Sequence, residues 1–151
     1  MKGCVIRDYR SPDKETVLDL FRMNTPAYFS MDEEKDLIHY LEHEIDLYYV
    51  IELNNKLIGC GGINFSENGT VGKISWDFLH PDYQGLGIGT LLLEHRINLL
   101  KETIGIQRIL VRTSQHAYKF YERSGFRLME TVKDYWASGF DLYRMEYARM
   151  P

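Results

Sequence analysis

The chain contains 151 residues, of which 44% are hydrophobic and 26% charged, and this balance excludes intrinsic disorder and a coiled-coil rod. Its length suits a single domain covering residues 1–151, and its longest apolar run, residues 47–51, is far shorter than the roughly 20 residues that span a bilayer, so we expect no membrane partner. The net charge of -4, without a basic tract, argues against nucleic acid as a partner and favours a cationic partner over an anionic one.

The first predicted elements are a strand and two helices. Residues 4–9 alternate roughly between apolar and polar and predict a short strand. Ser11-Pro12-Asp13 is a strong helix start, because it offers a capping oxygen, a proline for the first turn and an early acid. Ser30 and Glu33 have the spacing of a capping box and open a second helix.

A meander of three strands is expected next, at residues 47–53, 57–65 and 71–79, with turns at 54–56 and 67–69. The apolar period then becomes helical from about Gly87. A strand at 106–112, a short helix at 115–124 and two strands near 126–134 and 140–147 complete the chain. The order β-α-α-β-β-β-α-β-α-β-β predicts a mixed α+β fold.

The segment between the third meander strand and the next helix contains three alternating glycines, Gly85, Gly87 and Gly89. Glycine permits positive φ and has no Cβ, so successive N–H groups can converge on one anion, and the helix start adds unpaired donors. A diphosphate would suit such a loop. The spacing excludes a Walker loop and a dinucleotide fingerprint, but a simple turn followed by close helix packing stays open.

Two motifs resemble one known family. Residues 84–89, Q-G-L-G-I-G, resemble the Q/R-x-x-G-x-G/A acyl-CoA loop of the GNAT superfamily of N-acetyltransferases, and residues 117–126 are similar to its A-x-x-x-Y-E-x-x-G-F helix. The resemblance covers nearly the whole chain, because the element order also matches. It implies a central mixed, mostly antiparallel sheet of about seven strands flanked by four helices. D-Y-W at 134–136 and M-E at 145–146 further resemble the branch that acetylates protein N-termini.

The resemblance implies acetyl-CoA as co-substrate and no metal. Pantetheine would pair with the strand end at Phe78 and Leu79, because a strand edge without a neighbour can dock an amide-bearing arm. Backbone amides would hold the diphosphate at Gln84, Gly85, Gly87, Gly89 and Thr90. Ser114 stands where many relatives carry a pantetheine-binding Asn, and its shorter hydroxyl supplies fewer hydrogen bonds.

Acetyl transfer from a thioester requires that the amine lose a proton and that the departing thiolate gain one. Tyr121 occupies the tyrosine of the family's helix motif and is the predicted acid, although spacing alone would also allow a core aromatic there. Asp77 is the predicted base, because a partly buried carboxylate can take a proton. Local pairing of Asp77 and a water chain in its place stay open, and positions 73, 75 and 109 lack the acid or His of relatives.

The orientation of residues 73–79 decides where the acceptor would lie. Strand alternation predicts that Ile74, Trp76 and Phe78 share one face and that Lys73, Ser75 and Asp77 share the other, which we expect to be the acceptor side.

The acceptor itself is expected to be an amine-bearing small molecule or peptide. In the family fold it enters between the first two helices and the last hairpin, which predicts contacts from Tyr28, Phe29, Ser75, Tyr135 and Trp136. Each aromatic residue of that set could instead pack in the core or at its rim. The acids at 32–34 could attract a cationic amine or complement the dipole of their helix.

Two other functions stay open: a non-catalytic acyl-CoA-binding or sensing domain, and a structural module with an accidental glycine turn. Exposed aromatic residues in the last strands would suit a homodimer. Cys4 and Cys60 form no CxxC pair, no His or Cys spacing suggests a metal, and charge returns too early for a secretory signal. A cytoplasmic, reduced location is therefore expected.

Overall fold

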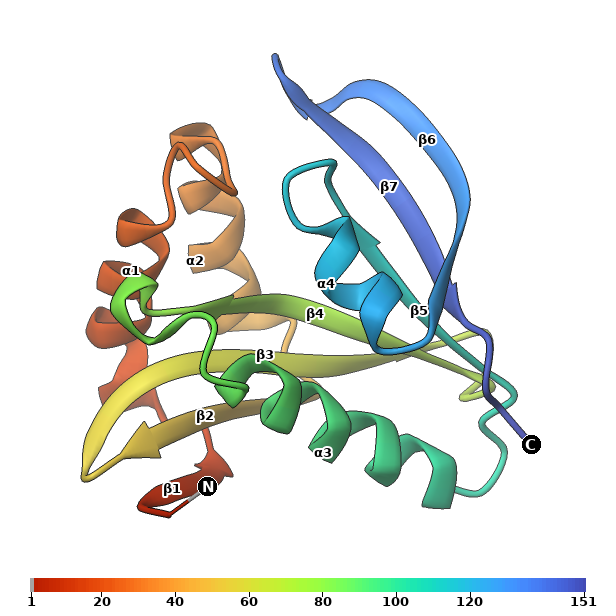
Figure 1. The fold of residues 1–151 in the computed structure, drawn as a ribbon, viewed down its shortest axis with the longest axis horizontal. Coiled ribbons are helices and arrows are strands. Elements are labelled where there is room, and N and C mark those ends of the chain that lie inside the picture. The colour runs from red at the N-terminus through yellow and green to blue at the C-terminus, as the bar shows by residue number, and fades with distance from the viewer. Residues whose placement is uncertain (1) are drawn as a thin grey trace.

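The computed structural model describes residues 2–151, which form a seven-stranded sheet in the order β1-β2-β3-β4-β5-β7-β6 (Figure 1). Within these residues β4 and β5 run parallel, and every other neighbouring pair is antiparallel. The strands are β1 (Cys4–Asp8), β2 (Leu47–Leu53), β3 (Lys56–Ser66), β4 (Val71–Leu79), β5 (Arg108–Thr113), β6 (Phe126–Ala137) and β7 (Phe140–Tyr147). The predicted fold class and element order are confirmed.

Four helices flank the sheet: α1 (Lys14–Met23), α2 (Glu34–His43), α3 (Ile88–Glu102) and α4 (Tyr118–Arg123). Short 3-10 turns at Ser11–Asp13 and Met31–Glu33 precede α1 and α2, so both helices begin later than their capping residues suggest. In the second of these turns Ser30 and Glu33 form the predicted capping box. No helix in residues 2–151 combines the length and apolar character that crossing a membrane requires.

The helices cover opposite faces of the sheet (Figure 1). Apolar side chains of α1 and α2, including Phe21 and Leu37, pack with Val50 and Phe78. On the other face, α3 packs against side chains of β2 to β5, and Tyr121 of α4 joins the same cluster. Both clusters are almost inaccessible to solvent, and this burial of apolar surface is the main stabilising contribution to such a fold.

A β-bulge in β4 overturns the predicted alternation of that strand. Ile74 belongs to the cluster on the α3 face, whereas Trp76 and Phe78 belong to the cluster on the α1–α2 face. The register with β3 shifts between Cys60 and Gly62, and Trp76 has φ +46°. An extra residue at a bulge resets the alternation of side chains, so Asp77 points to the α3 face.

Strands β4 and β5 pair only over a short distance and then separate. Their ladder runs from Val71 with Arg108 to Ile74 with Val111, and the rest of β4 is paired only with β3. The second half of β4 therefore presents a free backbone edge toward β5. This separation produces the opening in which the candidate site lies.

Candidate functional site

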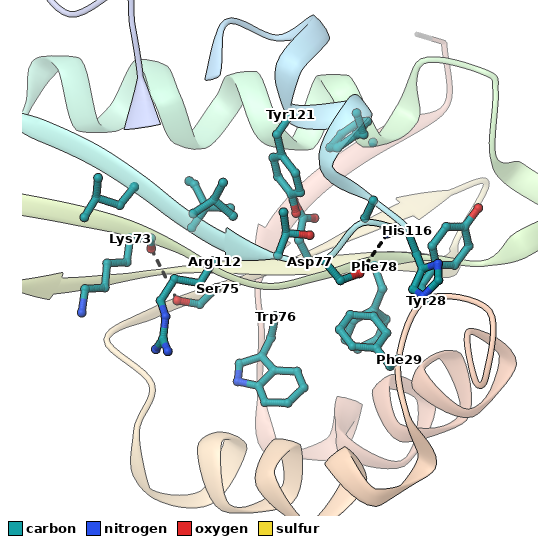
Figure 2. A pocket seen from close by; sticks show the side chains of 18 of the residues that line it. Tyr28, Phe29, Lys73, Ser75, Trp76, Asp77, Phe78, Arg112, His116 and Tyr121 are labelled. Atoms are coloured by element: carbon teal, nitrogen blue, oxygen red, sulfur yellow. Dashed lines mark hydrogen bonds between the residues drawn. The ribbon is translucent and has the colours of Figure 1, made fainter. Parts of the chain in front are cut away.

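A cleft of about 1230 Å³ lies where β4 and β5 separate, and it reaches both faces of the sheet. It brings together the end of β4, the glycine loop, α4, the α1–α2 loop and the last hairpin. Figure 2 shows side chains from β4, α4 and the α1–α2 loop around it. The predicted residues that line it are Tyr28, Phe29, Ser75, Asp77, Phe78, Leu79, Gln84, Gly85, Gly87, Gly89, Thr90, Ser114, Tyr121 and Trp136. Tyr135 is the one predicted site residue outside the lining.

The glycine loop offers bare backbone at one end of the cleft. Gly85 and Gly87 have φ +79° and +83°, conformations that side-chain-bearing residues rarely adopt, and no atom lies within 4 Å of the position a Cβ would take. Gly87 is the N-cap of α3, and no side chain caps the first N–H groups of that helix. Unblocked donors at the start of a long helix are a ready site for a diphosphate, so these residues fit the diphosphate of acetyl-CoA.

Glycine is needed at position 89 for a different reason, the close packing of two helices. A Cβ there would lie 3.3 Å from the Phe120 ring, so its absence lets α4 approach the start of α3. The two interpretations of the glycine motif thus hold at different positions: open backbone at Gly85 and Gly87, and close helix packing at Gly89.

The strand end next to the loop is held by a buried asparagine. Asn24 is 2% exposed, and its Nδ2 donates hydrogen bonds to the carbonyls of Leu79, at 3.0 Å, and Leu20, at 2.8 Å. This residue fixes the end of β4 to the end of α1. Nothing in the spacing of the sequence marked Asn24 as part of the site.

Ser114 is used locally within the structure. Its Oγ accepts the His116 N–H at 3.2 Å, and its carbonyl accepts the N–H groups of Ala117 and Tyr118. The hydroxyl therefore orders the turn into α4. A second, simultaneous contact with a pantetheine arm has correspondingly few partners available.

Three polar side chains, those of Tyr121, Asp77 and Arg96, form a connected polar network on the α3 face of the cleft. The Tyr121 hydroxyl donates to Asp77 Oδ2 at 3.1 Å, and Arg96 Nη2 lies 2.8 Å from the same oxygen. Figure 2 shows Tyr121 pointing from α4 toward Asp77. Burial, with a smaller effect of the Asp77 charge, raises the pKa of Tyr121 well above its ordinary value, so the phenol stays protonated at neutral pH.

Arg96, the cation of this polar network, belongs to α3 and is fully buried. Its Nε and Nη1 donate to the carbonyls of Leu92 and Gly62. A Cβ on Gly61 would lie 2.6 Å from Arg96 Nη1, so the glycine leaves room for the guanidinium. The available signal was a cation within the apolar helical stripe, four residues after Leu92 and four before Leu100.

Asp77 is thus placed between a buried cation and a phenol. Its Oδ2 contacts both the Arg96 guanidinium and the Tyr121 hydroxyl. The geometry favours Asp77 as the residue that orients Tyr121, which corresponds to the alternative of local pairing.

The opposite side of the cleft has an aromatic wall. Phe29 stacks on Trp76 with ring centroids 6.1 Å apart and an interplanar angle of 21°. Tyr28 donates to Gln84 Oε1 at 3.3 Å, which links the α1–α2 loop to the glycine loop. Trp136 donates from Nε1 to the Thr113 carbonyl at 3.0 Å. Four of the five predicted acceptor residues, Tyr28, Phe29, Ser75 and Trp136, therefore line the cleft.

Glu33 is a carboxylate that the sequence reasoning assigned only to the helix start or to attraction of an amine. It is 7% exposed, lines the cleft and accepts the Ser30 N–H at 2.9 Å. Burial is the main cause that raises the pKa of Glu33 above its ordinary value. A carboxylate with a raised pKa at the acceptor side is suited to take a proton.

Comparison with known proteins supports a common fold and common motifs. A family model described as "Acetyltransferase (GNAT) family" matches residues 14–126. The chain is 32% identical over 90 residues to an amino-acid acetyltransferase of Pasteurella multocida (strain Pm70), over 60% of this chain and 20% of that protein. It is 27% identical over 157 residues to an N-alpha-acetyltransferase of Sulfurisphaera tokodaii, over 93% of this chain and 90% of that protein.

The chain spans about a fifth of the length of the amino-acid acetyltransferases that it matches. Among solved structures, Arabidopsis thaliana Naa50 in complex with the bisubstrate analogue CoA-Ac-MVNAL superposes with a TM-score of 0.73 and 19% identity. The alignment covers 95% of this chain and 97% of that one. At this identity the likeness shows the fold.

Proposed function

Because the chain belongs to the GNAT acetyltransferase family, we propose that it transfers an acetyl group from acetyl-CoA to a primary amine by direct attack within a ternary complex. One observation supports this most strongly: the unblocked N–H groups of the glycine loop line the same cleft as the protonated Tyr121. Acetyl transfer from acetyl-CoA requires an anion-binding site for the diphosphate and a proton donor for the departing thiolate, and both line this one cleft.

Each part of the cleft has a proposed task. The loop from Gln84 to Thr90 holds the diphosphate, and the free edge of β4 at Phe78 and Leu79 pairs with the pantetheine arm. Acetyl-CoA supplies the activated acyl group. Tyr121, oriented by Asp77, donates a proton to the departing thiolate. Glu33 accepts the proton that the amine must lose, because its pKa is raised and it lies on the acceptor side.

The names of the relatives suggest the kind of amine. One is an amino-acid acetyltransferase and another an N-alpha-acetyltransferase, so the α-amine of an amino acid or of a peptide is the acceptor we propose. The stacked rings of Phe29 and Trp76, and Trp136 from the last hairpin, line the cleft and would contact such an amine.

The proposed setting of the enzyme is the cytoplasm, with residues 1–151 acting as one catalytic unit. The free thiols of Cys4 and Cys60 support a reducing compartment, and one sheet connects both sides of the cleft.

The test combines ligand binding with turnover. Acetyl-CoA at 100 times its Kd should stabilise the protein by about 2.7 kcal/mol in thermal unfolding. Free-thiol release should then appear with at least one member of a panel of amino acids, peptides and polyamines. Absence of acetyl-CoA binding would contradict the proposal at its base. Binding without turnover on any amine would indicate a non-catalytic acyl-CoA-binding domain instead.

A further inference from the structure

Cationic side chains gather on the sheet face that α1 and α2 cover, which is the proposed acceptor side. Lys73 lies opposite Asn64, whose Oδ1 accepts a hydrogen bond from Tyr40 of α2, so Lys73 faces the α1–α2 side. Lys73 also pairs with Leu110 of β5, and Arg112 follows two residues later on the same face. Figure 2 shows Lys73 and Arg112 on the side of Trp76, opposite Tyr121.

A third cation stands directly beside them. Arg112 and Arg144 are opposite each other in the ladder of β5 and β7, and both line the cleft. Like charges that face each other across a strand pair destabilise the sheet. Arg144 relieves part of this repulsion through an ion pair with Glu130 at 3.1 Å. An anion bound beside Arg112 would relieve the rest.

Lys73 and Arg112 are cations without an ion-pair partner in the described part of the chain. Among residues 2–151 neither side chain forms an ion pair with a carboxylate. The acids on this side of the cleft are engaged or exposed: Glu33 accepts the Ser30 N–H, and Glu44 and Glu67 are exposed at the rim. The two cations therefore face the cleft without an ion-pair partner among residues 2–151.

The Arg112 guanidinium is held in place by aromatic residues. Its Cζ lies 5.2 Å from the ring centroids of both Tyr135 and Trp136, and Nη2 donates to the Tyr135 hydroxyl. Trp136 is itself fixed by its hydrogen bond to Thr113. An arginine ordered in this way keeps most of its five N–H donors for a ligand and loses little freedom when it binds one.

We infer that Lys73 and Arg112 bind a carboxylate carried by the acceptor, so that the preferred substrates are amines bearing a carboxylate rather than polyamines. This inference rests on the proposed acetyl transfer and specifies its acceptor. Ser75 is one of the predicted acceptor residues and lies two residues, about 6.6 Å along the strand, from Lys73. A lysine side chain can span this distance, so Lys73 can reach an acceptor bound at Ser75. A free amino acid and a peptide with an acidic side chain both present this chemistry.

The experiment compares matched acceptors in wild type and variants. The acceptors are free amino acids and their carboxamides, C-terminally amidated tetrapeptides with Glu or Gln at the second position, and spermidine. The variants are Lys73→Gln and Arg112→Gln, and the control is Lys133→Gln, which removes the same charge from an exposed site of β6 outside the cleft. Acetyl-CoA affinity is measured for all of them.

We expect each cleft variant to lower kcat/KM for carboxylate acceptors by about tenfold, through KM, with little change for amides and with unchanged acetyl-CoA affinity. Because wild type and variant see the same amine, differences in amine basicity cancel. Loss with free amino acids alone, or with Glu peptides alone, identifies the source of the carboxylate. Lys133→Gln should behave as wild type.

Two results would overturn the inference and are distinguishable. If amides and spermidine react as well as carboxylate acceptors, and neither cleft variant changes their relative rates, the inference fails while acetyl transfer stands. If acetyl-CoA binds but no amine in the panel reacts, the proposed function fails and the inference with it.

Discussion

At the cofactor end of the cleft, the proposed diphosphate contacts come from consecutive residues, 84–90, and mainly from their backbone. At the acceptor end they come from side chains of β4, β5, the α1–α2 loop and the last hairpin, which are far apart in the sequence. Backbone recognition depends on φ and on the absence of Cβ atoms. Side-chain recognition depends on strand register, so one inserted residue redirects it.

The two ends also differ in charge. The whole chain is acidic, and this net charge of -4 led to the expectation of a cationic partner. The acceptor end nevertheless presents Lys73 and Arg112 without carboxylate partners in residues 2–151. The inferred carboxylate site follows this local charge and not the net charge, because solvent screens distant surface charges.

The largest effect should come from Tyr121, which stands between the two ends. Tyr121→Phe removes the proposed proton donor, so kcat should fall by about 10²- to 10⁴-fold while the Kd for acetyl-CoA is unchanged. Steady-state kinetics and titration with acetyl-CoA measure both. Tyr118→Phe, on the same helix but packed against Tyr143, is the control and should keep its kcat. An unchanged kcat in Tyr121→Phe would remove this residue from the mechanism.

Substitution of Arg96 tests how much the buried ion pair with Asp77 contributes to stability. Arg96→Met leaves Asp77 without its cation, so the free energy of unfolding should fall by about 3–5 kcal/mol. Adding Asp77→Asn should restore part of this stability, because the buried carboxylate charge is then gone. The kcat of the double variant should stay below that of wild type, because Tyr121 has lost the carboxylate that orients it. Urea unfolding of the single and double variants checks this. A single variant as stable as wild type would show that the ion pair contributes nothing.

Glu33 tests the proposed proton acceptor at the acceptor end. A base works only when ionised, so activity should fall as the pH is lowered through the raised pKa of Glu33. In Glu33→Gln that acid limb should disappear and kcat at pH 7 should be about 10²-fold lower.

Stability provides the control for Glu33. A carboxyl whose pKa rises on folding favours the folded state only below its unfolded pKa, and this benefit is lost as the pH rises through the folded value. Glu33→Gln should therefore be at least as stable as wild type at pH 7, and Gln can still accept the Ser30 N–H. A wild-type pH profile in this variant would assign the proton to another acceptor.

The smallest effect should come from the backbone at the cofactor end. Gly87→Ala places a Cβ in the open space where the diphosphate is proposed to lie, and its strain of about 1–2 kcal/mol at φ +83° favours a different loop conformation, so the Kd for acetyl-CoA should rise about tenfold. Gly69→Ala has the same strain, at φ +79° with open space around it, but lies in the β3–β4 turn. It should lose stability without losing affinity. Equal affinities in both variants would contradict a diphosphate site at Gly87.

Local signals predicted most of the fold. Capping residues, turns and apolar periods gave every strand and helix, and the glycine motif and the helix motif at 117–126 gave the family. The bulge at Trp76 was not predicted, because alternation over 73–79 is regular in the sequence and only the register with β3 reveals the extra residue. For that reason, the sheet faces predicted for Ile74 and Asp77 were wrong.

The polar side chains of the site were the harder part. Asp77 was found, but its partner Arg96 was not, because the contact joins a strand to a helix whose sequence reads as an ordinary amphipathic segment. Lys73 and Arg112 are brought together by the β4–β5 pairing, which has no local signature. Glu33 was recognised as a capping residue and as one of three acids that could attract an amine, but not as a candidate proton acceptor, because its burial in the cleft depends on the tertiary fold.

Gly61 limits how this protein can be engineered. A designer who wanted a more robust sheet would replace a mid-strand glycine by valine or isoleucine, since glycine is a poor strand former. At position 61 any added carbon would collide with the guanidinium of Arg96. Directed evolution toward higher heat tolerance should therefore leave this glycine untouched unless the arginine is exchanged in the same step.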